Sequence, residues 1–335
     1  MNFIVISLKK NFFMITFLLF FIFLIFFSEN NILAAKDGLA LWINNIVPSM
    51  FPFFVATELL CQTNFIYFLG KIFKKIMKPF FNVPEESSSA LLLGTISGYP
   101  IGAKMVCNLK EKKIISKVEA ERLIAYTNNS GPLFILGAVG ISLFGNKKIG
   151  FILLFSHIIS CLIVGFLFKN WKKNNLNINY KLFKTDTEKL IKLSDLGEIL
   201  GTAIKTSLIN ILTIGGFVVL FSVIISIIES SGIIDIFSTL FQQFGISKNF
   251  TKALFLGMIE LTNGVNLSSK LFIENNLLSI LLTSFLLGFG GLSILFQIYS
   301  IIAKEGISIK PYVYGKFLHG LISIFITLIL YILFH

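Results

Sequence analysis

Long apolar runs without charge constrain this chain more than any other feature. Residues Phe12–Phe27 carry no acidic or basic side chain, and Phe151–Phe168 and Phe317–His335 carry none apart from histidine. A helix rises about 1.5 Å per residue, so roughly 20 such residues cross a hydrocarbon core of about 30 Å. Several runs of this length in 335 residues predict an all-α polytopic protein in contact with the lipid bilayer.

Charged and sulfur-containing residues exclude two other classes of protein. The net charge of +12 comes from lysines in short segments between apolar runs, such as Lys110–Lys117 and Lys169–Lys192. This pattern is typical of cytoplasmic loops and does not predict a nucleic-acid partner. The three cysteines form no CxxC or Cys/His cluster, so we expect no disulfide framework, no metal site and no cofactor.

An internal repeat divides the chain into two halves. Residues Ala90–Ile96 align with Ala253–Ile259, and further matches follow in the same order, including His157 with His319. We therefore expect two homologous repeats of the same helical fold.

The domain boundaries follow from this repeat. We expect an N-terminal transmembrane helix at 1–29, a first repeat at 30–169, a basic cytoplasmic linker at 170–195 and a second repeat at 196–335. If the first helix starts in the cytoplasm, an odd number of crossings per repeat gives the repeats opposite orientations. Inverted repeats are the usual architecture of secondary transporters.

Each repeat contains two apolar segments too short to span a bilayer. Segments Ser87–Ile96 and Ile101–Leu109 flank a Gly-Tyr-Pro turn, and Ala253–Leu261 and Val265–Ile273 flank Thr262–Gly264. Each pair predicts a re-entrant helical hairpin, which is tolerated at membrane depth only when it is buried in protein or lines a wet cavity.

A second interruption in each repeat predicts a broken transmembrane helix. It lies at Thr127–Pro132 in the first repeat and at Gly288–Gly291 in the second. Interrupted segments at matching positions of two repeats are the best sequence indication of a transport site.

The interruptions therefore supply the candidate substrate-binding residues. They are Ser97, Gly98, Tyr99, Pro100, Gly102, Lys104, Asn128, Asn129, Ser130, Asn263 and Gly264.

Three of these predictions have structural alternatives. Lys104 could bind a carboxylate, or it could extend to the headgroups. Asn129 and its neighbours could bind substrate or a coupling ion, or only cap a helix. Glu260 is the coupling candidate, because intramembrane carboxylates bind protons or cations. Its alternative is a structural partner for Lys104.

The motifs at these interruptions resemble a known family. SGYPIGAKMV at 97–106 and EAERLIAYTNNSGPLFILGAVG at 119–140 look like the signature stretch of the YlbJ-type sporulation integral membrane proteins, and GLALWINNIVPSMFPFF at 38–54 fits the same family. The resemblance implies the nucleoside-recognition, or gate, domain superfamily, which also includes concentrative nucleoside transporters. The family's sporulation member is implicated in moving dipicolinic acid into the developing spore. The resemblance therefore implies a multi-pass cell membrane protein, in the outer forespore membrane if the organism sporulates.

The favoured interpretation is a secondary transporter or facilitator of a small organic anion, with dipicolinate as the substrate that the resemblance implies. The sequence has no nucleophile–base pair, P-loop or dinucleotide fingerprint, so we do not expect an enzyme. Two alternatives stay open: a nucleoside or other solute carrier of the same fold, and a non-transporting membrane scaffold in sporulation. The oligomeric state also stays open, a homo-oligomer included.

Overall fold

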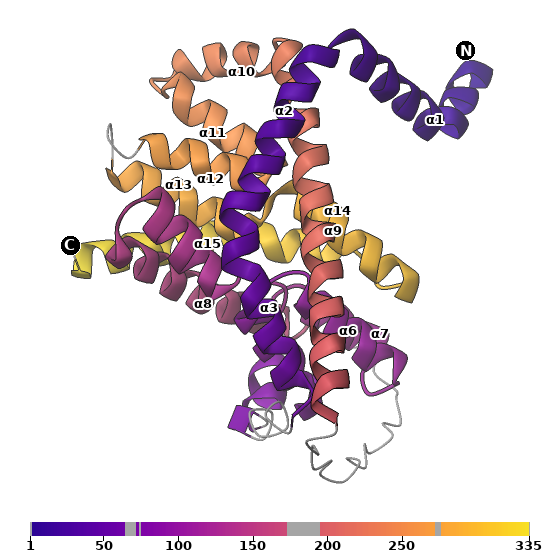
Figure 1. Cartoon of the computed structure of the whole chain (residues 1–335), viewed down its shortest axis with the longest axis vertical. Helices are drawn as coiled ribbons and strands as arrows, with labels where there is room; N and C mark the ends of the chain where they lie inside the picture. The colour runs from indigo at the N-terminus through magenta and orange to yellow at the C-terminus, as the bar shows by residue number, and fades with distance from the viewer. Residues whose placement is uncertain (1, 64–71, 74, 173–194, 272–275, 335) are drawn as a thin grey trace.

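The computed structural model describes residues 2–63, 72–73, 75–172, 195–271 and 276–334. Within these ranges the chain folds into helices joined by turns, with no strand (Figure 1). The predicted all-α class is therefore confirmed. Most of the predicted linker at 170–195 lies outside the described residues, as do Ile273 of the second hairpin and His335.

The first half of the chain contains the following helices: α1 (Asn2–Phe26), α2 (Ser28–Leu41), η1 (Trp42–Ile46), α3 (Val47–Cys61), η2 (Met77–Phe81), η3 (Glu85–Ser87), α5 (Ser88–Ile96), α6 (Ile101–Glu111), α7 (Lys117–Ile124), η4 (Phe134–Leu143) and α8 (Lys147–Phe168). The second half contains α9 (Leu196–Ser230), α10 (Ile233–Gln242), α11 (Lys248–Ile259), α12 (Leu261–Lys270), α13 (Asn276–Phe289), α14 (Gly291–Ile302), η8 (Ala303–Glu305) and α15 (Lys310–Phe334). The two halves thus share one order of elements: a long helix, a hairpin, a helix that ends at a break, a helix that follows it, and a final long helix.

Five stretches of the described chain are long and apolar enough to cross a membrane. They are Ser28–Leu60, Lys147–Phe168, Leu196–Ser230, Leu277–Glu305 and Lys310–Phe334. Large apolar side chains on these helices face outward, among them Phe155, Leu212 and Phe325. In an integral membrane protein, lipid surrounds such side chains. This surface therefore fits the bilayer contact expected from the sequence. Helix α1 lies within the predicted first span at 1–29, and its stretch Asn11–Phe26 is apolar.

The first hairpin forms where the sequence predicts it. Helices α5 and α6 pack against each other and are joined at Ser97–Pro100. A Cβ added to Gly94 would lie 3.0 Å from the Cα of Gly102 and 1.7 Å from the Thr127 carbonyl oxygen. Only glycine allows this close approach, so the hairpin is held directly against the break that follows α7.

The turn of the second hairpin was predicted wrongly. Helix α11 ends at Ile259 and α12 begins at Leu261, so only Glu260 is non-helical, and Thr262–Gly264 lie in the first turn of α12. The Glu260 carboxylate caps α12, because it accepts hydrogen bonds from the backbone N–H groups of Thr262 (3.0 Å) and Asn263 (2.7 Å). The capping carboxylate lets the helix restart at once, and a longer turn is unnecessary.

The same glycine contact holds the second hairpin together. A Cβ on Gly264 would lie 2.0 Å from the Cα of Gly257, and Gly257 aligns with Gly94 of the first hairpin. The break after α13 also meets its own hairpin, since a Cβ on Gly291 would lie 3.3 Å from the backbone nitrogen of Leu261. Each half therefore places a hairpin tip directly against a broken helix.

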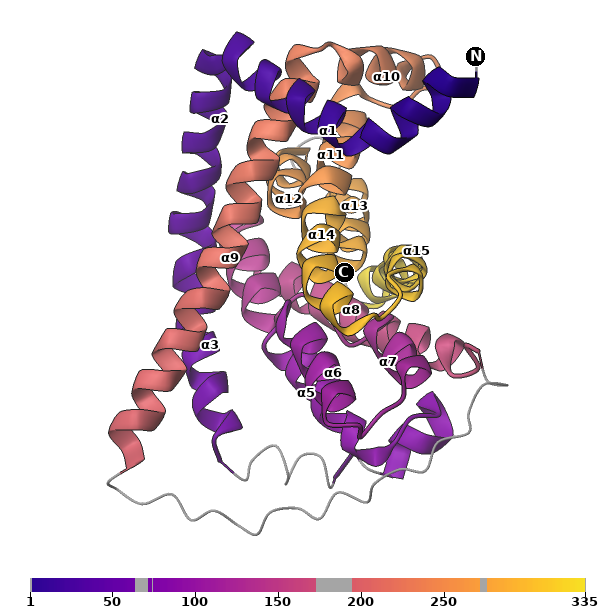
Figure 2. The same cartoon turned by 90° about the vertical axis from the view of Figure 1, so that its right-hand side faces the viewer.

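The long helices pack in antiparallel pairs that join the two halves. Gly38 lies against Ser222, whereas Trp42 further along donates from its indole Nε1 to the carbonyl oxygen of Ile211 (3.0 Å), so α9 runs back along α2–α3. Figure 2 shows these helices as a long column at one side of the molecule, and in Figure 1 the column runs down the middle of the view.

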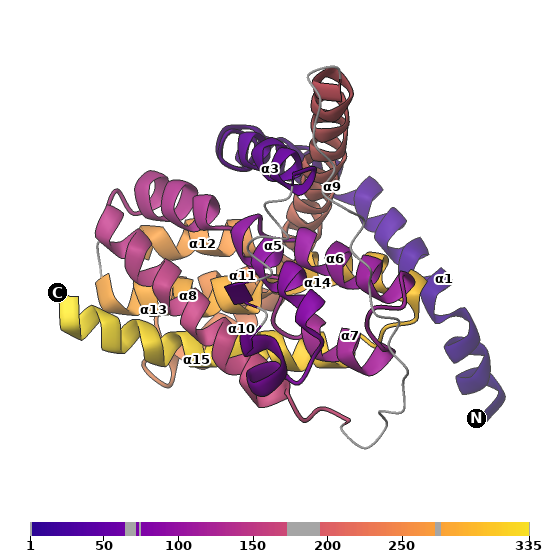
Figure 3. The same cartoon turned by 90° about the horizontal axis from the view of Figure 1, so that it is seen from below.

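Helices α8 and α15 form the second pair. The rings of Trp171, beyond the end of α8, and Tyr314, near the start of α15, are 6.4 Å apart, and those of His157 and His319 are 4.4 Å apart. Helix α15 therefore also runs back along α8. Seen from below, the pair lies on the side of the hairpins away from the long column (Figure 3). The hairpin tips and the breaks lie between the two pairs.

Candidate functional site

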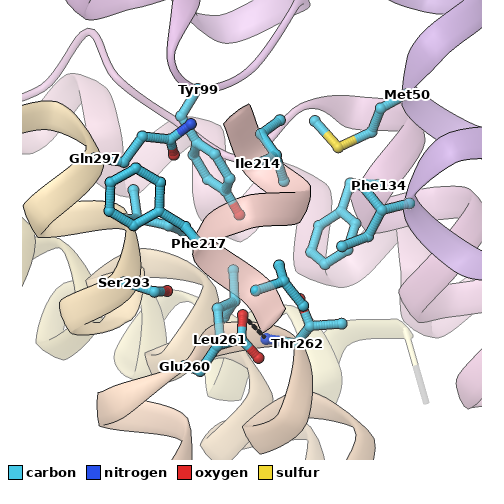
Figure 4. A pocket seen from close by; sticks show the side chains of 13 residues that line it. Met50, Tyr99, Phe134, Ile214, Phe217, Glu260, Leu261, Thr262, Ser293 and Gln297 are labelled. Atoms are coloured by element: carbon cyan, nitrogen blue, oxygen red, sulfur yellow. Dashed lines mark hydrogen bonds between the residues drawn. The ribbon is translucent and has the colours of Figure 1, made fainter. Parts of the chain in front are cut away.

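A cavity lies where the tips of both hairpins meet the long column (Figure 4). The space open to the centre of a water molecule is about 20 Å³, enough for about one water. The lining residues come from six elements and both hairpin turns: Ile46, Met50, Tyr99, Phe134, Ile214, Phe217, Val218, Glu260, Leu261, Thr262, Ser293, Ile294 and Gln297. Mostly apolar walls with a few polar groups are typical of small-molecule sites.

The first hairpin contributes Tyr99, which is held by the break after α7. The Tyr99 backbone N–H donates to the carbonyl oxygen of Asn129 (2.7 Å), and the Ser130 hydroxyl lies 3.4 Å from the Tyr99 hydroxyl. Tyr99 and Glu260 point into the cavity from opposite sides (Figure 4). Both hairpins therefore bring a polar side chain to the same space.

Helix α14 contributes a hydrogen-bond donor that has no partner among the described residues. Gln297 is buried, and its Nε2 has no hydrogen-bond partner in the described part of the chain. Ser293, one helical turn earlier, lines the same wall. A buried amide donor without a partner is unfavourable by about 1–3 kcal/mol unless a ligand or water satisfies it. Gln297 therefore offers a buried donor to a water molecule or a polar ligand in this cavity.

Of the predicted binding residues, only Tyr99 lines this cavity, together with the coupling candidate Glu260. Ser97, Gly98, Pro100 and Gly102 lie behind Tyr99: a Cβ on Gly98, whose φ is +83°, would lie 2.7 Å from the backbone nitrogen of Gly131. These residues fit the first hairpin against the break. Gly264 has the equivalent packing role in the second hairpin.

Asn128, Asn129 and Ser130 are fully buried in the break, and their contacts run to both halves. The Asn128 side chain donates to the Tyr312 hydroxyl (3.4 Å), and the Asn129 amide donates to the carbonyl oxygen of Tyr126 (2.8 Å). The Asn128 Oδ1 and Ser97 Oγ atoms are buried and, among the described residues, have no partner. The break thus retains polar atoms that a ligand or water can satisfy.

Lys104 lies apart from the cavity. Its ammonium group hydrogen-bonds to Asn210 Oδ1 of α9, which ties the first hairpin to the long column. It forms no ion pair with Glu260 in the described structure, so the alternative of a structural Lys104–Glu260 pair is wrong. Lys104 instead pairs with a neutral side chain of the second half.

Asn263 faces a second, more polar groove. Its amide donates to the Ser222 hydroxyl (3.0 Å), and the groove between α2 and α9 is also lined by Asn30, Asp37 and Glu229. Because Thr262 lines the cavity and Asn263 lines this groove, the start of α12 separates the two spaces.

Sequence reasoning missed several side chains of the site. Gln297 and Ser293 are isolated polar residues in an apolar helix, and this pattern could have revealed them. Lys316 is 3% exposed in α15, within hydrogen-bonding range of Asn129, and a lysine one turn before His319 was an available signal. Phe134 and Phe217 gave no signal, because aromatic residues occur throughout this chain. No group of three or more His, Cys, Asp or Glu residues in the described ranges is placed to hold a metal.

The fold has recognisable relatives. Residues 43–167 match the Gate family, described as nucleoside recognition. CNTnw, solved in an inward-facing substrate-bound state, shares the fold over 84% of this chain and 74% of that chain, with a TM-score of 0.54 and 14% sequence identity. The protein is therefore an integral membrane protein with a transporter-like gate fold.

The sporulation integral membrane protein YlbJ of Bacillus subtilis (strain 168) is similar over most of the sequence. The two are 33% identical over 317 residues, which cover 89% of this chain and 77% of that protein. The chain belongs to the YlbJ family of sporulation integral membrane proteins, and the resemblance seen in its motifs is confirmed. The relatives found are membrane proteins of transport and sporulation, and none is an enzyme.

Proposed function

We propose that this protein transports a small planar solute, which binds in the cavity between the two hairpin tips. The observation that carries the proposal is the convergence of Tyr99, Glu260 and the unpartnered Gln297 amide on one buried space. Such a space at the meeting point of interrupted helices is where secondary transporters bind substrate.

The walls of the cavity favour a ring-containing solute. Three aromatic side chains, Tyr99, Phe134 and Phe217, line it. Aromatic rings stack on flat molecules, and the Gln297 amide can donate to a ring nitrogen or a carboxylate oxygen. Dipicolinate carries all of these acceptors, and membership of the sporulation family favours it as the first substrate to test. In that case the protein would act in the outer forespore membrane of its organism.

Glu260 is compatible with an anion because its charge is already compensated. Both carboxylate oxygens accept hydrogen bonds from the first turn of α12, where the helix dipole favours negative charge.

A neutral heterocycle of nucleoside type is the second candidate. Glu260 is the one charged side chain among the thirteen lining residues, and a neutral solute avoids repulsion from it. A non-transporting scaffold is the third alternative, in which a bound water would satisfy the Gln297 amide.

Uptake by the purified protein in proteoliposomes separates these functions. The vesicles are loaded with unlabelled dipicolinate or uridine, and entry of the same labelled compound by exchange is followed. We expect exchange of dipicolinate at least tenfold above protein-free vesicles. Exchange of uridine alone would favour the second candidate, and exchange of neither compound would contradict the proposed function.

We further propose that the two halves are inverted repeats. The antiparallel pairing of α2–α3 with α9, and of α8 with α15, supports this arrangement. The boundaries 30–169 and 196–335 place one member of each pair in each repeat. Inversion would let the two hairpins approach the cavity from opposite membrane faces.

A further inference from the structure

A cluster of basic side chains lies where α8 and α15 pack together, and the proposed substrate site does not use it. Lys316 and His319 come from α15, and His157 comes from α8; none is more than 3% exposed. An ionisable side chain buried in a helix long enough to span a membrane is rare and is a functional candidate by default, and Lys316 is such a residue.

Lys316 has only weak, neutral partners. Its Nζ lies 3.4 Å from Asn129 Oδ1 and 3.5 Å from His319 Nδ1. No carboxylate in the described ranges forms an ion pair with it. A buried ammonium that is fixed by a carboxylate keeps its proton, whereas one held by an amide oxygen and an imidazole can release it.

The surrounding hydrogen bonds orient the two histidines. His319 Nε2 lies 2.9 Å from the carbonyl oxygen of His157, which can only accept, so Nε2 carries the hydrogen. In the neutral ring, His319 Nδ1 is then an acceptor that faces Lys316. His157 Nε2 accepts from the Ser130 backbone N–H (3.1 Å), so His157 is also neutral, with its hydrogen on Nδ1.

Lys316 and His319 therefore form a donor–acceptor pair for one proton. On transfer, an N–H bond of the Lys316 ammonium breaks and an N–H bond forms at His319 Nδ1. The positive charge moves from the amine to the imidazole, and the Nε2 hydrogen bond to His157 is kept. Because the His157 and His319 rings are 4.4 Å apart, a second positive charge beside the first is strongly disfavoured.

Other titratable groups also pack against α15, and the Cys161 thiol, which donates to the carbonyl oxygen of Tyr126 (3.0 Å), is close enough to interact with Lys316. Helix α8 presents His157 and Cys161, and the break presents Tyr126; α13 has no titratable side chain. On α7, Glu119 closes the helix cap with Ser116, Glu121 pairs with Lys172 and Trp171, and Arg122 donates to the carbonyl oxygens of Trp171 and Asn82.

The cluster is connected to the cavity. Asn129, which accepts from Lys316, also accepts the Tyr99 backbone N–H through its carbonyl oxygen, and Ser130 contacts both His157 and the Tyr99 hydroxyl. Lys316 belongs to the second half and Asn129 to the first. A movement of the halves that opens the cavity would therefore alter the contacts of Lys316 at the same time.

We propose that Lys316 is the proton-coupling residue of this protein, with His319 as the second position of the proton. The proton is bound in one state of the transport cycle and released in the other, so a pH gradient drives the solute. This inference rests on the proposed transport function.

Two assays on the same proteoliposomes test it, with labelled dipicolinate as the probe. The first is exchange at equal pH on both sides, which needs no net proton movement; the second is net accumulation under a pH gradient imposed in either direction. The informative variant is Lys316→Arg, because arginine keeps the charge but does not release its proton. Lys310→Gln, an exposed lysine at the start of the same helix, is the matched control.

We expect the wild type and Lys310→Gln to accumulate dipicolinate at least tenfold more with one direction of the gradient than without it. Lys316→Arg should keep exchange within about threefold of the wild type and lose the gradient-driven accumulation. His319→Gln should behave in the same way, and it serves as the second test if Lys316 variants do not purify.

Two results would overturn the coupling role. The first is gradient-driven accumulation that persists in Lys316→Arg, or in His319→Gln where Lys316 variants do not purify. The second is wild-type accumulation that does not respond to a gradient of either direction. Failure of the wild type to exchange dipicolinate or uridine is a different result: it would contradict the transport function itself, and the coupling role with it.

Discussion

Glu260 shows how one residue joins the stability of a hairpin to the chemistry of the cavity. Its carboxylate faces the cavity and at the same time supplies the cap of α12. An intramembrane acid suggests ion binding when only the sequence is known. The geometry shows that a large part of its hydrogen-bonding capacity is used by the protein itself. The cap also explains why the second hairpin turns at a single residue.

Removal of this cap should destabilise the protein. Glu260→Ala deletes the acceptor for two buried backbone N–H groups, and loss of a helix cap is unfavourable by about 0.5–2 kcal/mol. We expect the thermal unfolding midpoint in detergent to fall by a few degrees, and Glu260→Asp to recover part of the loss. Glu198→Ala, at an exposed glutamate in the first turn of α9, is the control. An unchanged midpoint in Glu260→Ala would show that the cap contributes nothing.

At the level of elements, the two hairpins share one construction. Gly94 meets Gly102 in the first, and Gly257 meets Gly264 in the second. Close backbone contact through small residues is a common way to pack helices in a membrane, where the hydrophobic effect does not drive helix association. The contact fixes the angle of each hairpin and hence the position of its tip at the cavity.

Gly264→Ala should therefore weaken the second hairpin. The added methyl group would lie 2.0 Å from the Gly257 Cα, and overpacking of this kind costs about 1–3 kcal/mol. The matched control is Gly216→Ala in α9, where a Cβ meets no atom within 4 Å. Thermal unfolding followed by size-exclusion chromatography should show loss of folded protein at a lower temperature only for Gly264→Ala. An equal effect of both substitutions would refute the proposed contact.

Elements formed by residues that are close together in the sequence were predictable. Contacts between elements far apart in the sequence were not. Short apolar segments around Gly98–Pro100 predicted the first hairpin, because too few residues remained to span a bilayer. Thr262–Gly264 looked like a turn, yet the Glu260 cap allows a helix there.

The cavity could not be predicted in this way, because Met50, Phe134, Phe217 and Gln297 meet only after the two halves assemble. Lys316 lies one turn before His319 and could be noticed in the sequence, but its contacts could not. Its significance depends on Asn129, a residue of the other half.

At the scale of the whole molecule, we propose two inverted repeats that enclose one cavity. Both pairs of corresponding long helices are antiparallel, and this arrangement is what inverted repeats require. The transporter-like fold and the sporulation family then place the cavity in a protein that spans a membrane.

Labelling from each membrane face tests the inversion. Lys148 and Lys310 are exposed residues at the starts of α8 and α15, which correspond in the two halves. Single cysteines at these positions, in a chain without its native cysteines, should react with an impermeant thiol reagent from opposite sides of the membrane. Reaction of both from the same side would rule out inverted repeats.

Binding to the cavity is the most direct test of the central claim. Equilibrium binding of labelled dipicolinate, with uridine in parallel, is measured on the purified wild type, Gln297→Leu and the control Gln243→Leu, an exposed glutamine after α10. Loss of one hydrogen bond to a bound ligand is worth about 1–3 kcal/mol, so we predict at least fivefold weaker binding of the preferred solute by Gln297→Leu and no change for Gln243→Leu. Equal binding by all three proteins would contradict the assignment of the substrate to the cavity between the hairpin tips.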